Sequence, residues 1–377
     1  MKDVFIVADN IISPLGITTD ENFTAISKGL SGVRQQFDPA LSEASFYASL
    51  FDDANDLLAN KNDSYTKFEQ LLIASVSSAL ENTNIDITGA NVILIISSTK
   101  GNISLIENAP LSPELKERVA LHTSAKLVAD YFHFAAKPLV VSNACISGLI
   151  GILTGMRLIQ SGQYDHAVVV GADVISKFVL SGFQSFQAIS AAPCRPFDAE
   201  RNGINLGEGA GTVILSADQT HSKGIKITGG SVSNDANHIS GPSRTGEELC
   251  QAIKKAMKDA SITETDIGFI SAHGTATLYN DEMEALAISL AGLLAVPVNS
   301  LKGYYGHTLG AAGIIESIIS IQSMKQSIIL PSLGFSRLGV TQPLNISNSL
   351  QATSFTNCLK TASGFGGCNA ALIFNKQ

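Results

Sequence analysis

Four side chains that could do chemistry each follow an apolar stretch of the kind that forms a buried strand. They are one thiol, two imidazoles and one ammonium group, at Cys145, His273, His307 and Lys302. Binding sites of parallel α/β folds are built where the carboxyl ends of strands meet, so we expect these groups to converge. A Cys close to His groups can act as a nucleophile toward an acyl carbon, or it can hold a metal ion.

The segment around Cys145 has the pattern of a buried strand, a sharp turn and a buried helix. Leu139 to Val141 are apolar and β-favouring, polar residues follow, and apolar residues then continue from Cys145 to Gly162. Cys145 is thus predicted at or near a helix N-terminus, where unpaired N–H groups and the helix dipole favour a thiolate. The alternative is a small buried residue that fills a gap, which is common for a free Cys.

The two imidazoles have a structural alternative as well, because a buried His is often no more than a satisfied core side chain. A metal site on Cys145, His273 and His307 is less favoured, since these residues lack local ligand spacing and Lys302 would repel a cation. We expect no metal. The glycine-rich run from Gly203 to Gly211 has neither common phosphate-binding pattern, so we expect no phosphate site there.

The elements that must position these groups alternate between strands and helices. Val92 to Ile96 is a continuous apolar run typical of a strand buried on both faces, and Tyr65 to Leu80 has apolar residues at helical spacing. The second part of the chain repeats this plan, because residues 296–302 parallel residues 137–143 and again precede a buried helix. We therefore predict an α/β fold with an internal duplication.

The amino-acid composition indicates a globular protein and argues against some functions. With 377 residues, of which 45% are hydrophobic, the chain can bury a large core in one large or two medium domains. The net charge of -8 with only 25 basic residues argues against nucleic-acid binding, which needs a concentrated positive face. The five cysteines are scattered and form no CxxC pair, which predicts free thiols in a reducing cytoplasm.

No segment has the pattern of a membrane span. The short apolar run from Val4 to Ala8 lies between Asp3 and Asp9, so it is interpreted as the first strand rather than a signal peptide. The apolar helix after His307 is interrupted by Glu316, which favours a core helix.

Taken jointly, the motifs in these segments resemble those of the β-ketoacyl-[acyl carrier protein] synthases, condensing enzymes with the thiolase fold. The motifs occur in family order over almost the whole chain: the Ala144-Cys145 elbow, PFDxxRxG…GEGAG from Pro196 to Gly211, His273-Gly274-Thr275-x-Thr277 with Asp281 and Glu284, Lys302-x4-His307-Thr308-Leu309-Gly310-Ala311-Ala312-Gly313, and Gly364-Phe365-Gly366-Gly367-x-Asn369. The resemblance implies a layered α-β-α-β-α fold of two pseudo-repeated halves. Residues 1–220 would carry the nucleophile, and residues 221–377 the two His, the Lys and the GFGG loop.

The same resemblance implies a ping-pong condensation. Cys145 would take an acyl group from a carrier-protein thioester, and the N–H groups of Cys145 and Phe365 would form the oxyanion hole. Malonyl carrier protein would then lose carbon dioxide while His273 and His307 donate hydrogen bonds to the enolate. The family's lysine corresponds to Lys302.

Further residues receive expected roles from the resemblance. Lys302 is expected to hold the network in place through Glu316 or His273, and Asp281 and Glu284 to support the residues that contact substrate. The remaining positions are expected to bind substrate: Thr275 and Thr277 on the pantetheine arm, with Ser363, Gly364 and Phe365 beside the acyl group. No cofactor is expected, because the phosphopantetheine travels with the carrier protein.

The chain departs from the family pattern in three respects. It is short, its elbow has the sequence Ser142-Asn143-Ala144-Cys145-Ile146-Ser147, and Ser363 stands where an aromatic gate usually precedes the GFGG loop. A small residue there removes the gate, unless Phe365, Tyr304 or Tyr305 takes its place. These differences suggest secondary metabolism or a type II polyketide-like pathway as readily as fatty-acid synthesis.

The resemblance also predicts partners. Acyl carrier protein is expected to dock on Lys67 and Arg201, and a dimer with an identical or homologous subunit is expected to form through the strand Ala167 to Val170. The alternatives are a non-catalytic partner subunit of the chain-length-factor type and a thiolase that uses coenzyme A. A thiolase would carry a second catalytic Cys, for which Cys368 is the nearest candidate in sequence.

Overall fold

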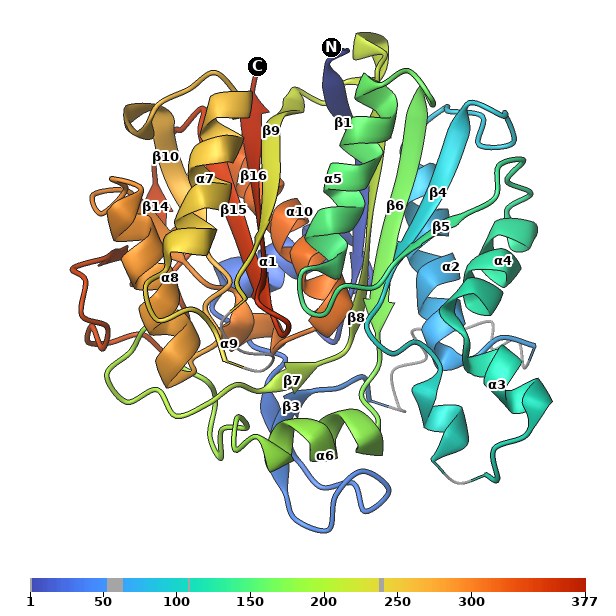
Figure 1. The fold of residues 1–377 in the computed structure, drawn as a ribbon, viewed down its shortest axis with the longest axis horizontal. Helices are drawn as coiled ribbons and strands as arrows, with labels where there is room; N and C mark the ends of the chain where they lie inside the picture. The colour runs from blue at the N-terminus through green and yellow to red at the C-terminus, as the bar shows by residue number, and fades with distance from the viewer. Residues whose placement is uncertain (1, 53–63, 108, 237–240) are drawn as a thin grey trace.

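The computed structural model describes residues 2–52, 64–107, 109–236 and 241–377, and its centre is an eleven-stranded mixed sheet (Figure 1). The strand order is β13-β11-β10-β15-β16-β9-β1-β8-β6-β4-β5. The amino-terminal strands are β1 (Val4–Ile12), β4 (Val92–Ser97), β5 (Leu139–Val141), β6 (His166–Asp173) and β8 (Gly209–Ser216). The carboxy-terminal strands are β9 (Ile225–Asn234), β10 (Ile267–Ser271), β11 (Pro297–Asn299), β13 (Asn345–Ile346), β15 (Asn357–Gly364) and β16 (Cys368–Lys376).

The two groups of strands join where β1 pairs with β9 through Val4 and Phe5. Helices cover both outer faces and also fill the space between the groups (Figure 1). The outer helices are α2 (Lys67–Leu80) and α4 (Leu121–Tyr131) on one side, and α7 (Glu247–Asp259) and α8 (Leu278–Leu290) on the other. The inner helices are α5 (Ser147–Gln160) and α10 (Ala312–Gln326). Three clusters of buried apolar residues, one for each helical layer, hold this arrangement together.

The predicted layered α-β-α-β-α arrangement is therefore confirmed. Its layers follow from the sequence pattern, because strands such as β4 are apolar at every position and must be covered on both faces. Helix α10 is buried along almost its whole length, which explains why its sequence is largely apolar, with Glu316, Gln322 and short hydroxyl residues as its buried polar side chains. The division into halves at residue 220 stays a prediction.

The inner helices α5 and α10 cross at very short distance, and glycines make this crossing possible. A Cβ atom on Gly148 would lie 2.7 Å from the Gly310 carbonyl oxygen, and one on Gly313 would lie 2.5 Å from the Leu149 nitrogen. Both distances are below the contact limit, so a side chain at either position would push the helices apart. The crossing brings the amino-terminal ends of both helices to the same place.

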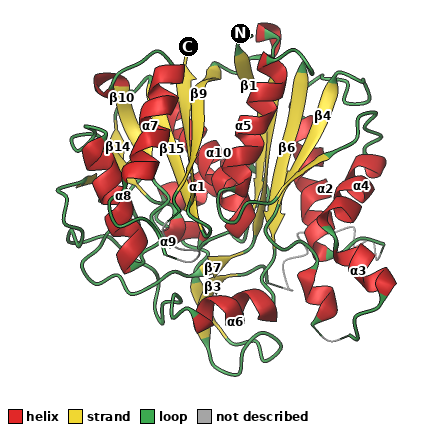
Figure 2. Cartoon of the chain, in the orientation of Figure 1, coloured by secondary structure: helices red, strands yellow, loops and turns green. Residues whose placement is uncertain are grey.

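Smaller elements gather at one end of the layers (Figure 2). They include α6 (Lys177–Ser185), α9 (Lys302–Tyr305) and a small sheet of β2 (Arg34–Gln36), β3 (Phe46–Ser49) and β7 (Leu206–Gly207). Elsewhere lie α1 (Thr19–Ser27), α3 (Pro113–Val119), and the strand pair β12 (Ile328–Ile329) and β14 (Gln351–Ala352). Short 3-10 helices span Ile103–Ile106, Gln219–His221, Glu264–Asp266 and Leu309–Ala311.

The strand order corrects one prediction. The run from Ala167 to Val170 lies in β6, which pairs with β4 on one side and with β8 on the other. It has no free edge, so a sheet cannot continue through it across a two-fold axis. An uninterrupted apolar run shows burial of both faces, and an interior strand gives that same signal. The edges of the sheet in the described residues are β13 and β5.

No helix in the described part of the chain is long and apolar enough to cross a membrane.

Candidate active site

A cavity of about 580 Å³ lies at the convergence of the inner helices and the ends of β10 and β15. Its lining brings together the predicted thiol and both imidazoles, as well as Thr275, Thr277, Ser363, Gly364 and Phe365. Other lining residues include Phe183 and Phe186 beside the GFGG loop, and Leu278 and Tyr279, which are well exposed to solvent. Three of the four groups named from the sequence, Cys145, His273 and His307, thus meet at this cavity, although they come from both halves of the chain.

Cys145 sits on a tight elbow between β5 and α5. Ala144 has a φ of 44°, a left-handed conformation that is uncommon for a residue with a Cβ atom. Ser147 holds the turn, because its hydroxyl donates to the Ala144 carbonyl at 2.6 Å and accepts from the Asn143 N–H at 2.8 Å. Helix α5 begins at Ser147, which confirms the prediction that Cys145 lies near a helix N-terminus.

The protonation of this thiol differs from the sequence-based expectation of a thiolate. Burial raises the pKa of Cys145 to about 12, while the Lys302 charge and a hydrogen bond from the Phe365 N–H act in the opposite direction. Only 8% of the residue is exposed, so the cost of burying a negative sulfur outweighs these stabilising groups. The resting group is therefore a thiol, and it must lose its proton when substrate arrives.

One of the two backbone N–H groups predicted for the oxyanion hole contacts the sulfur. The Phe365 N–H hydrogen-bonds the Cys145 sulfur. The GFGG loop reaches the elbow closely, since a Cβ on Gly364 would lie 3.1 Å from the Cys145 nitrogen. Gly367 adopts a φ of 74°, and a Cβ there would lie 2.0 Å from the Asp235 carbonyl oxygen, so this turn accepts only glycine.

His273 and His307 face each other beside the thiol. Their ring centroids are 5.2 Å apart with an interplanar angle of 83°, and the ligand atoms of Cys145, His273 and His307 all lie within 4.8 Å of one another. Burial lowers the pKa of both imidazoles well below the usual value, and the Lys302 charge lowers it further. Both rings are thus neutral near pH 7. Among the described residues, Nδ1 of His273 and both ring nitrogens of His307 have no hydrogen-bond partner.

The glycine-rich run from Gly203 to Gly211 positions the backbone of His307. The His307 N–H donates to the Asn205 carbonyl at 2.7 Å, and the Gly207 N–H donates to the His307 carbonyl at 3.0 Å. A Cβ on Gly207 would lie 1.9 Å from the Tyr305 carbonyl oxygen. Close backbone approach therefore explains the glycines of this motif.

Lys302 occupies the buried place that its predicted role requires. Its Nζ donates to the His273 carbonyl at 3.1 Å and forms an ion pair with Glu316, so it contacts both partners considered from the sequence. Burial alone would raise the pKa of Glu316, but Lys302 and Lys360 outweigh that effect and the pKa is lowered. Lys360 was missed in the sequence analysis. The feature that could have pointed to it is a lysine within an apolar strand, where it follows Cys358 and Leu359.

Two buried carboxylates hold the turn that follows β10. Glu284 accepts hydrogen bonds from the N–H groups of His273 at 2.8 Å and Gly274 at 2.6 Å. Asp281 accepts from the Thr275 N–H at 2.9 Å, and burial raises its pKa to about 7. Asp281 and Glu284 thus lie behind the cavity lining, in the supporting places expected for them.

Ser363 occupies the position where the family usually has an aromatic gate. Ser363 is buried and donates to the Asn369 side chain at 2.7 Å. Phe183 and Phe186 contact the ring of Phe365 at centroid distances of 5.7 Å and 5.4 Å, which forms an aromatic cluster at the cavity. Of the three substitutes considered from the sequence, Phe365 lines the cavity, whereas Tyr304 and Tyr305 are buried outside its lining.

Of the two residues predicted to dock the carrier protein, Lys67 is exposed and stays a prediction, whereas Arg201 is poorly placed for that role. Arg201 is buried, and its guanidinium donates to the carbonyls of Asp198 and Gly339 and lies 3.8 Å from Asp281. Lys67 forms an ion pair with Glu208 at 2.7 Å. The prediction for Arg201 is wrong, because its motif position reflects an internal hydrogen-bonding role that a count of surface charges cannot distinguish.

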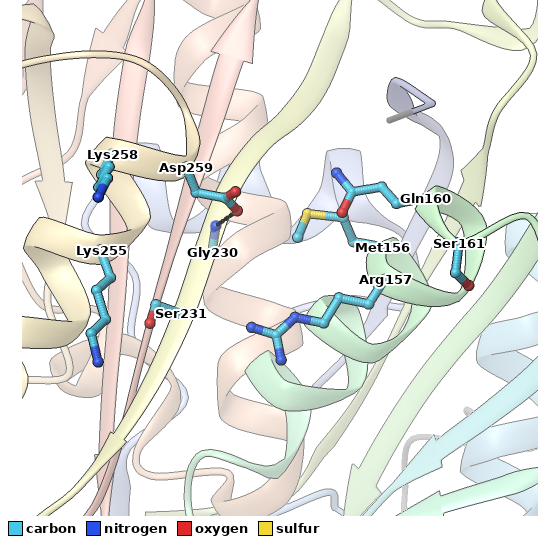
Figure 3. A pocket seen from close by; sticks show the side chains of 9 residues that line it. All are labelled: Met156, Arg157, Gln160, Ser161, Gly230, Ser231, Lys255, Lys258 and Asp259. Atoms are coloured by element: carbon cyan, nitrogen blue, oxygen red, sulfur yellow. Dashed lines mark hydrogen bonds between the residues drawn. The ribbon is translucent and has the colours of Figure 1, made fainter.

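A second cavity, of about 660 Å³, lies between α5 and α7 (Figure 3). Arg157, Lys255 and Lys258 line it together with Asp259, whose carboxylate accepts from the Gly230 N–H at 3.1 Å. It contains none of the residues predicted to do chemistry.

The thiol and the two imidazoles lie close enough together that a metal site on them must be considered. Tetrahedral zinc needs ligand atoms roughly 3.5 Å apart, and the ion carries two positive charges. The Lys302 ammonium already acts on all three groups, as its effect on the pKa of each shows. A divalent cation would therefore meet a positive neighbour, and the site suits acyl chemistry better.

A buried cysteine on an elbow, with N–H donors and two neutral imidazoles in a layered α/β fold, defines the class of thiolase-fold acyl-transfer sites. A family model described as the β-ketoacyl synthase N-terminal domain matches residues 1–221, and one described as the C-terminal domain matches residues 225–336. The chain belongs to the β-ketoacyl synthase family.

Similar proteins extend over the whole chain. A 3-oxoacyl-[acyl-carrier-protein] synthase 2 of Vibrio cholerae is 29% identical and aligns with 100% of this chain and 99% of its own length. A β-ketoacyl synthase structure from Burkholderia phymatum has a TM-score of 0.89 and 26% identity, with 100% of both chains covered. A ketosynthase from Xenorhabdus doucetiae, solved in complex with its chain length factor, has a TM-score of 0.84 and 25% identity, covering 100% of this chain and 98% of that one.

Proposed function

We propose that this protein is a 3-oxoacyl-[acyl-carrier-protein] synthase that condenses an acyl thioester with malonyl carrier protein. The observation that carries the proposal is the convergence of the Cys145 sulfur with two neutral imidazoles inside 4.8 Å, next to the Phe365 N–H. Full-length similarity to a protein of that name supports the same activity.

In the first half-reaction the Cys145 sulfur attacks the carbonyl carbon of the acyl thioester. A new carbon–sulfur bond forms, the bond to the carrier's pantetheine sulfur breaks, and the thiol proton ends on that departing sulfur. The N–H groups of Cys145 and Phe365 stabilise the tetrahedral oxyanion, and each such donor contributes roughly 3 kcal/mol. The high pKa of Cys145 means that deprotonation accompanies attack rather than preceding it.

In the second half-reaction malonyl carrier protein loses carbon dioxide. The bond between the carboxylate and the α-carbon breaks, and its electron pair forms an enolate. The neutral rings of His273 and His307 donate hydrogen bonds to the enolate oxygen, for which their unpartnered nitrogens are available. The α-carbon then attacks the acyl carbonyl, and the Cys145 sulfur leaves and regains a proton.

The proposed partners follow from the same chemistry. Acyl carrier protein brings both substrates, and Thr275 and Thr277, whose hydroxyls are 2.8 Å apart, hold the pantetheine arm at the cavity lining. The proposed reaction needs no cofactor, because the phosphopantetheine travels with the carrier protein. We place the protein in the cytoplasm, which suits its five free, buried cysteines. We further propose pairing with an identical or homologous subunit, as supported by the similar ketosynthase that was solved with its chain length factor.

Two alternatives fit the site less well. A non-catalytic partner subunit needs no nucleophile, yet here the elbow, the N–H donors and both imidazoles are complete. A thiolase needs a second reactive thiol in the cavity. The Cys368 sulfur instead donates to the Phe365 carbonyl at 3.2 Å, behind the loop and outside the cavity lining.

The test is intact-protein mass spectrometry after incubation with a panel of acyl carrier proteins. The wild type should gain one acyl group on Cys145, and Cys145→Ala should gain none. Cys368→Ala is the matched control and should be acylated like the wild type. Acylation of Cys145→Ala to the wild-type extent would refute the assignment, and loss in Cys368→Ala alone would favour the thiolase alternative.

A further inference from the structure

Lys360 is a fully buried lysine in β15 that the reaction scheme above does not use. Its exposed fraction is 0%, and the residues that alternate with it on the same face, Cys358 and Ala362, belong to the core around the inner helices. A buried ammonium group is costly unless acceptors surround it. Its position therefore requires a set of partners.

Those partners are found, and two of them belong to the segment that carries His273. The Lys360 Nζ donates to the carbonyls of Ser271 and Ala272, both at 3.2 Å, and lies 2.7 Å from a carboxylate oxygen of Glu316. Two carbonyl hydrogen bonds and one close carboxylate thus offset the cost of burying this ammonium group.

Lys302 binds the next carbonyl along the same segment. Its Nζ donates to the His273 carbonyl at 3.1 Å and pairs with the other carboxylate oxygen of Glu316. Three consecutive carbonyls, at residues 271, 272 and 273, are therefore held by two ammonium groups that share one carboxylate. These carbonyls lie where β10 ends, so an unpaired buried carbonyl there would be strongly unfavourable.

Glu284 holds the same segment from the other side. It accepts from the His273 and Gly274 N–H groups, and the hydroxyl of Thr361, next to Lys360 in β15, donates to it at 3.2 Å. Two lysines and two glutamates thus surround the backbone of His273. Loss of Lys360 would remove one of the two buried positive charges behind the imidazole.

We propose that Lys360 is a positioning residue for His273, which it fixes through the carbonyls of the strand end and through Glu316. The proposal rests on the proposed function, because it assigns Lys360 to the decarboxylation step in which His273 acts. The residue does not touch substrate. It holds the imidazole at the distance that the enolate requires, and its charge lowers the pKa of the ring in addition to burial, Lys302 and His307.

The test compares Lys360→Met with the wild type in two separate assays. Release of carbon dioxide from malonyl carrier protein should fall between about 10-fold and 100-fold, because small displacements of a catalytic group have effects of this size. Acylation of Cys145 should stay within about 2-fold, and KM for malonyl carrier protein should not change. Lys376→Met is the matched control, since Lys376 on the neighbouring strand also binds a carbonyl, that of Met324, at the far end of α10.

The pH profile separates positioning from a loss of stability. Removing a nearby positive charge raises the pKa of His273, so the acid limb of carbon dioxide release should move to higher pH in Lys360→Met. The same shift should be seen directly by NMR of ¹⁵N-labelled histidine, which needs no activity. If Lys360→Met does not fold, Lys360→Gln, which keeps an N–H donor but no charge, should show the same two shifts.

Two results would overturn the proposal. One is a parallel fall of acylation and carbon dioxide release in a folded variant, which is the mark of a general structural role. The other is an unchanged titration of His273. A wild type that neither accepts acyl groups nor releases carbon dioxide would refute the proposed function instead, and the NMR titration would still decide the role of Lys360.

Discussion

Cys145 shows how one residue can be reactive without being ionised at rest. Its elbow, its place before α5 and its N–H donors match what the sequence predicted, yet burial dominates the pKa. A protonated sulfur is protected from oxidation and from unspecific electrophiles. Reactivity then depends on the bound thioester, which brings the acyl carbon to the sulfur.

This thiol should react with iodoacetamide in a distinctive pH-dependent way. With a pKa of about 12, only about one sulfur in ten thousand is ionised at pH 8, so the rate should rise about tenfold per pH unit up to pH 10. The rate is measured by mass spectrometry of the Cys145 peptide, with free cysteine as the reference that levels off near pH 9. A plateau below pH 8 would show that the helix N-terminus and Lys302 overcome the effect of burial.

The aromatic cluster offers a second prediction for a single side chain. Phe186 is 55% exposed and contacts Phe365, so Phe186→Ala should open the cavity at little cost in stability. Turnover of long or rigid acyl groups should rise relative to short saturated ones, as measured across a chain-length series. Phe178→Ala, in the helix that ends just before Phe186 but outside the cavity lining, is the control. Equal effects on all acyl groups would contradict a gating role.

Some site residues could be predicted from the sequence because they belong to local motifs. Others could not, because their roles depend on which elements the fold brings together. Cys145, His273, His307 and Lys302 follow strand ends, and their motifs come with a fixed order along the chain. Lys360 has no motif of its own, and its role depends on which strand lies beside β10. Strand neighbours that are 89 residues apart along the chain are set by the topology, which local patterns do not contain.

At the scale of an element, the crossing of α5 and α10 sets the geometry of the reaction. Each helix starts beside one part of the site, since Cys145 precedes α5 and His307 precedes α10. The glycines Gly148 and Gly313 let the two backbones meet. Apolar periodicity predicted both helices as buried, but it could not tell that they touch each other, because a helix buried against strands gives the same pattern.

Gly313→Ala should therefore damage both stability and activity. The added Cβ would lie 2.5 Å from the Leu149 nitrogen, which is backbone and cannot rotate away, so overpacking should lower the free energy of unfolding by roughly 1–3 kcal/mol. Urea unfolding measures the loss, and kcat should fall with it. Gly182→Ala in α6, where nothing lies within 4 Å, should be neutral or slightly stabilising. Equal stability of the two variants would contradict the tight crossing.

At the scale of the whole molecule, β5 is the edge strand nearest to the active site. Its residue Leu139 is exposed, whereas β6, the strand expected at the interface, lies inside the sheet. An apolar edge strand next to the nucleophile elbow is a surface that a second subunit can continue as a sheet. The sequence pattern predicted that the strand Ala167 to Val170 is apolar, but it could not give the position of that strand in the sheet.

Leu139→Glu should accordingly weaken association between subunits. In a symmetric pair the two new carboxylates would approach each other across the axis, and like charges at strand pairs are destabilising. Sedimentation velocity at micromolar concentration should show a dimer for the wild type and a shift toward monomer for the variant. Leu350→Glu, at an exposed leucine in the other half, should sediment like the wild type. Identical sedimentation of both variants would place the interface elsewhere.

The uneven burial around the cavity has an evolutionary consequence. The reacting groups lie on backbone that is fixed by glycines and buried charges, where almost any replacement disturbs folding as well as catalysis. Leu278 and Tyr279 at the cavity are 58% and 77% exposed, and replacing such side chains has little effect on stability. Mutation can therefore explore new acyl substrates at the cavity mouth while the bond-forming chemistry stays constant, so lineages of this chain can diversify in product without passing through an inactive ancestor.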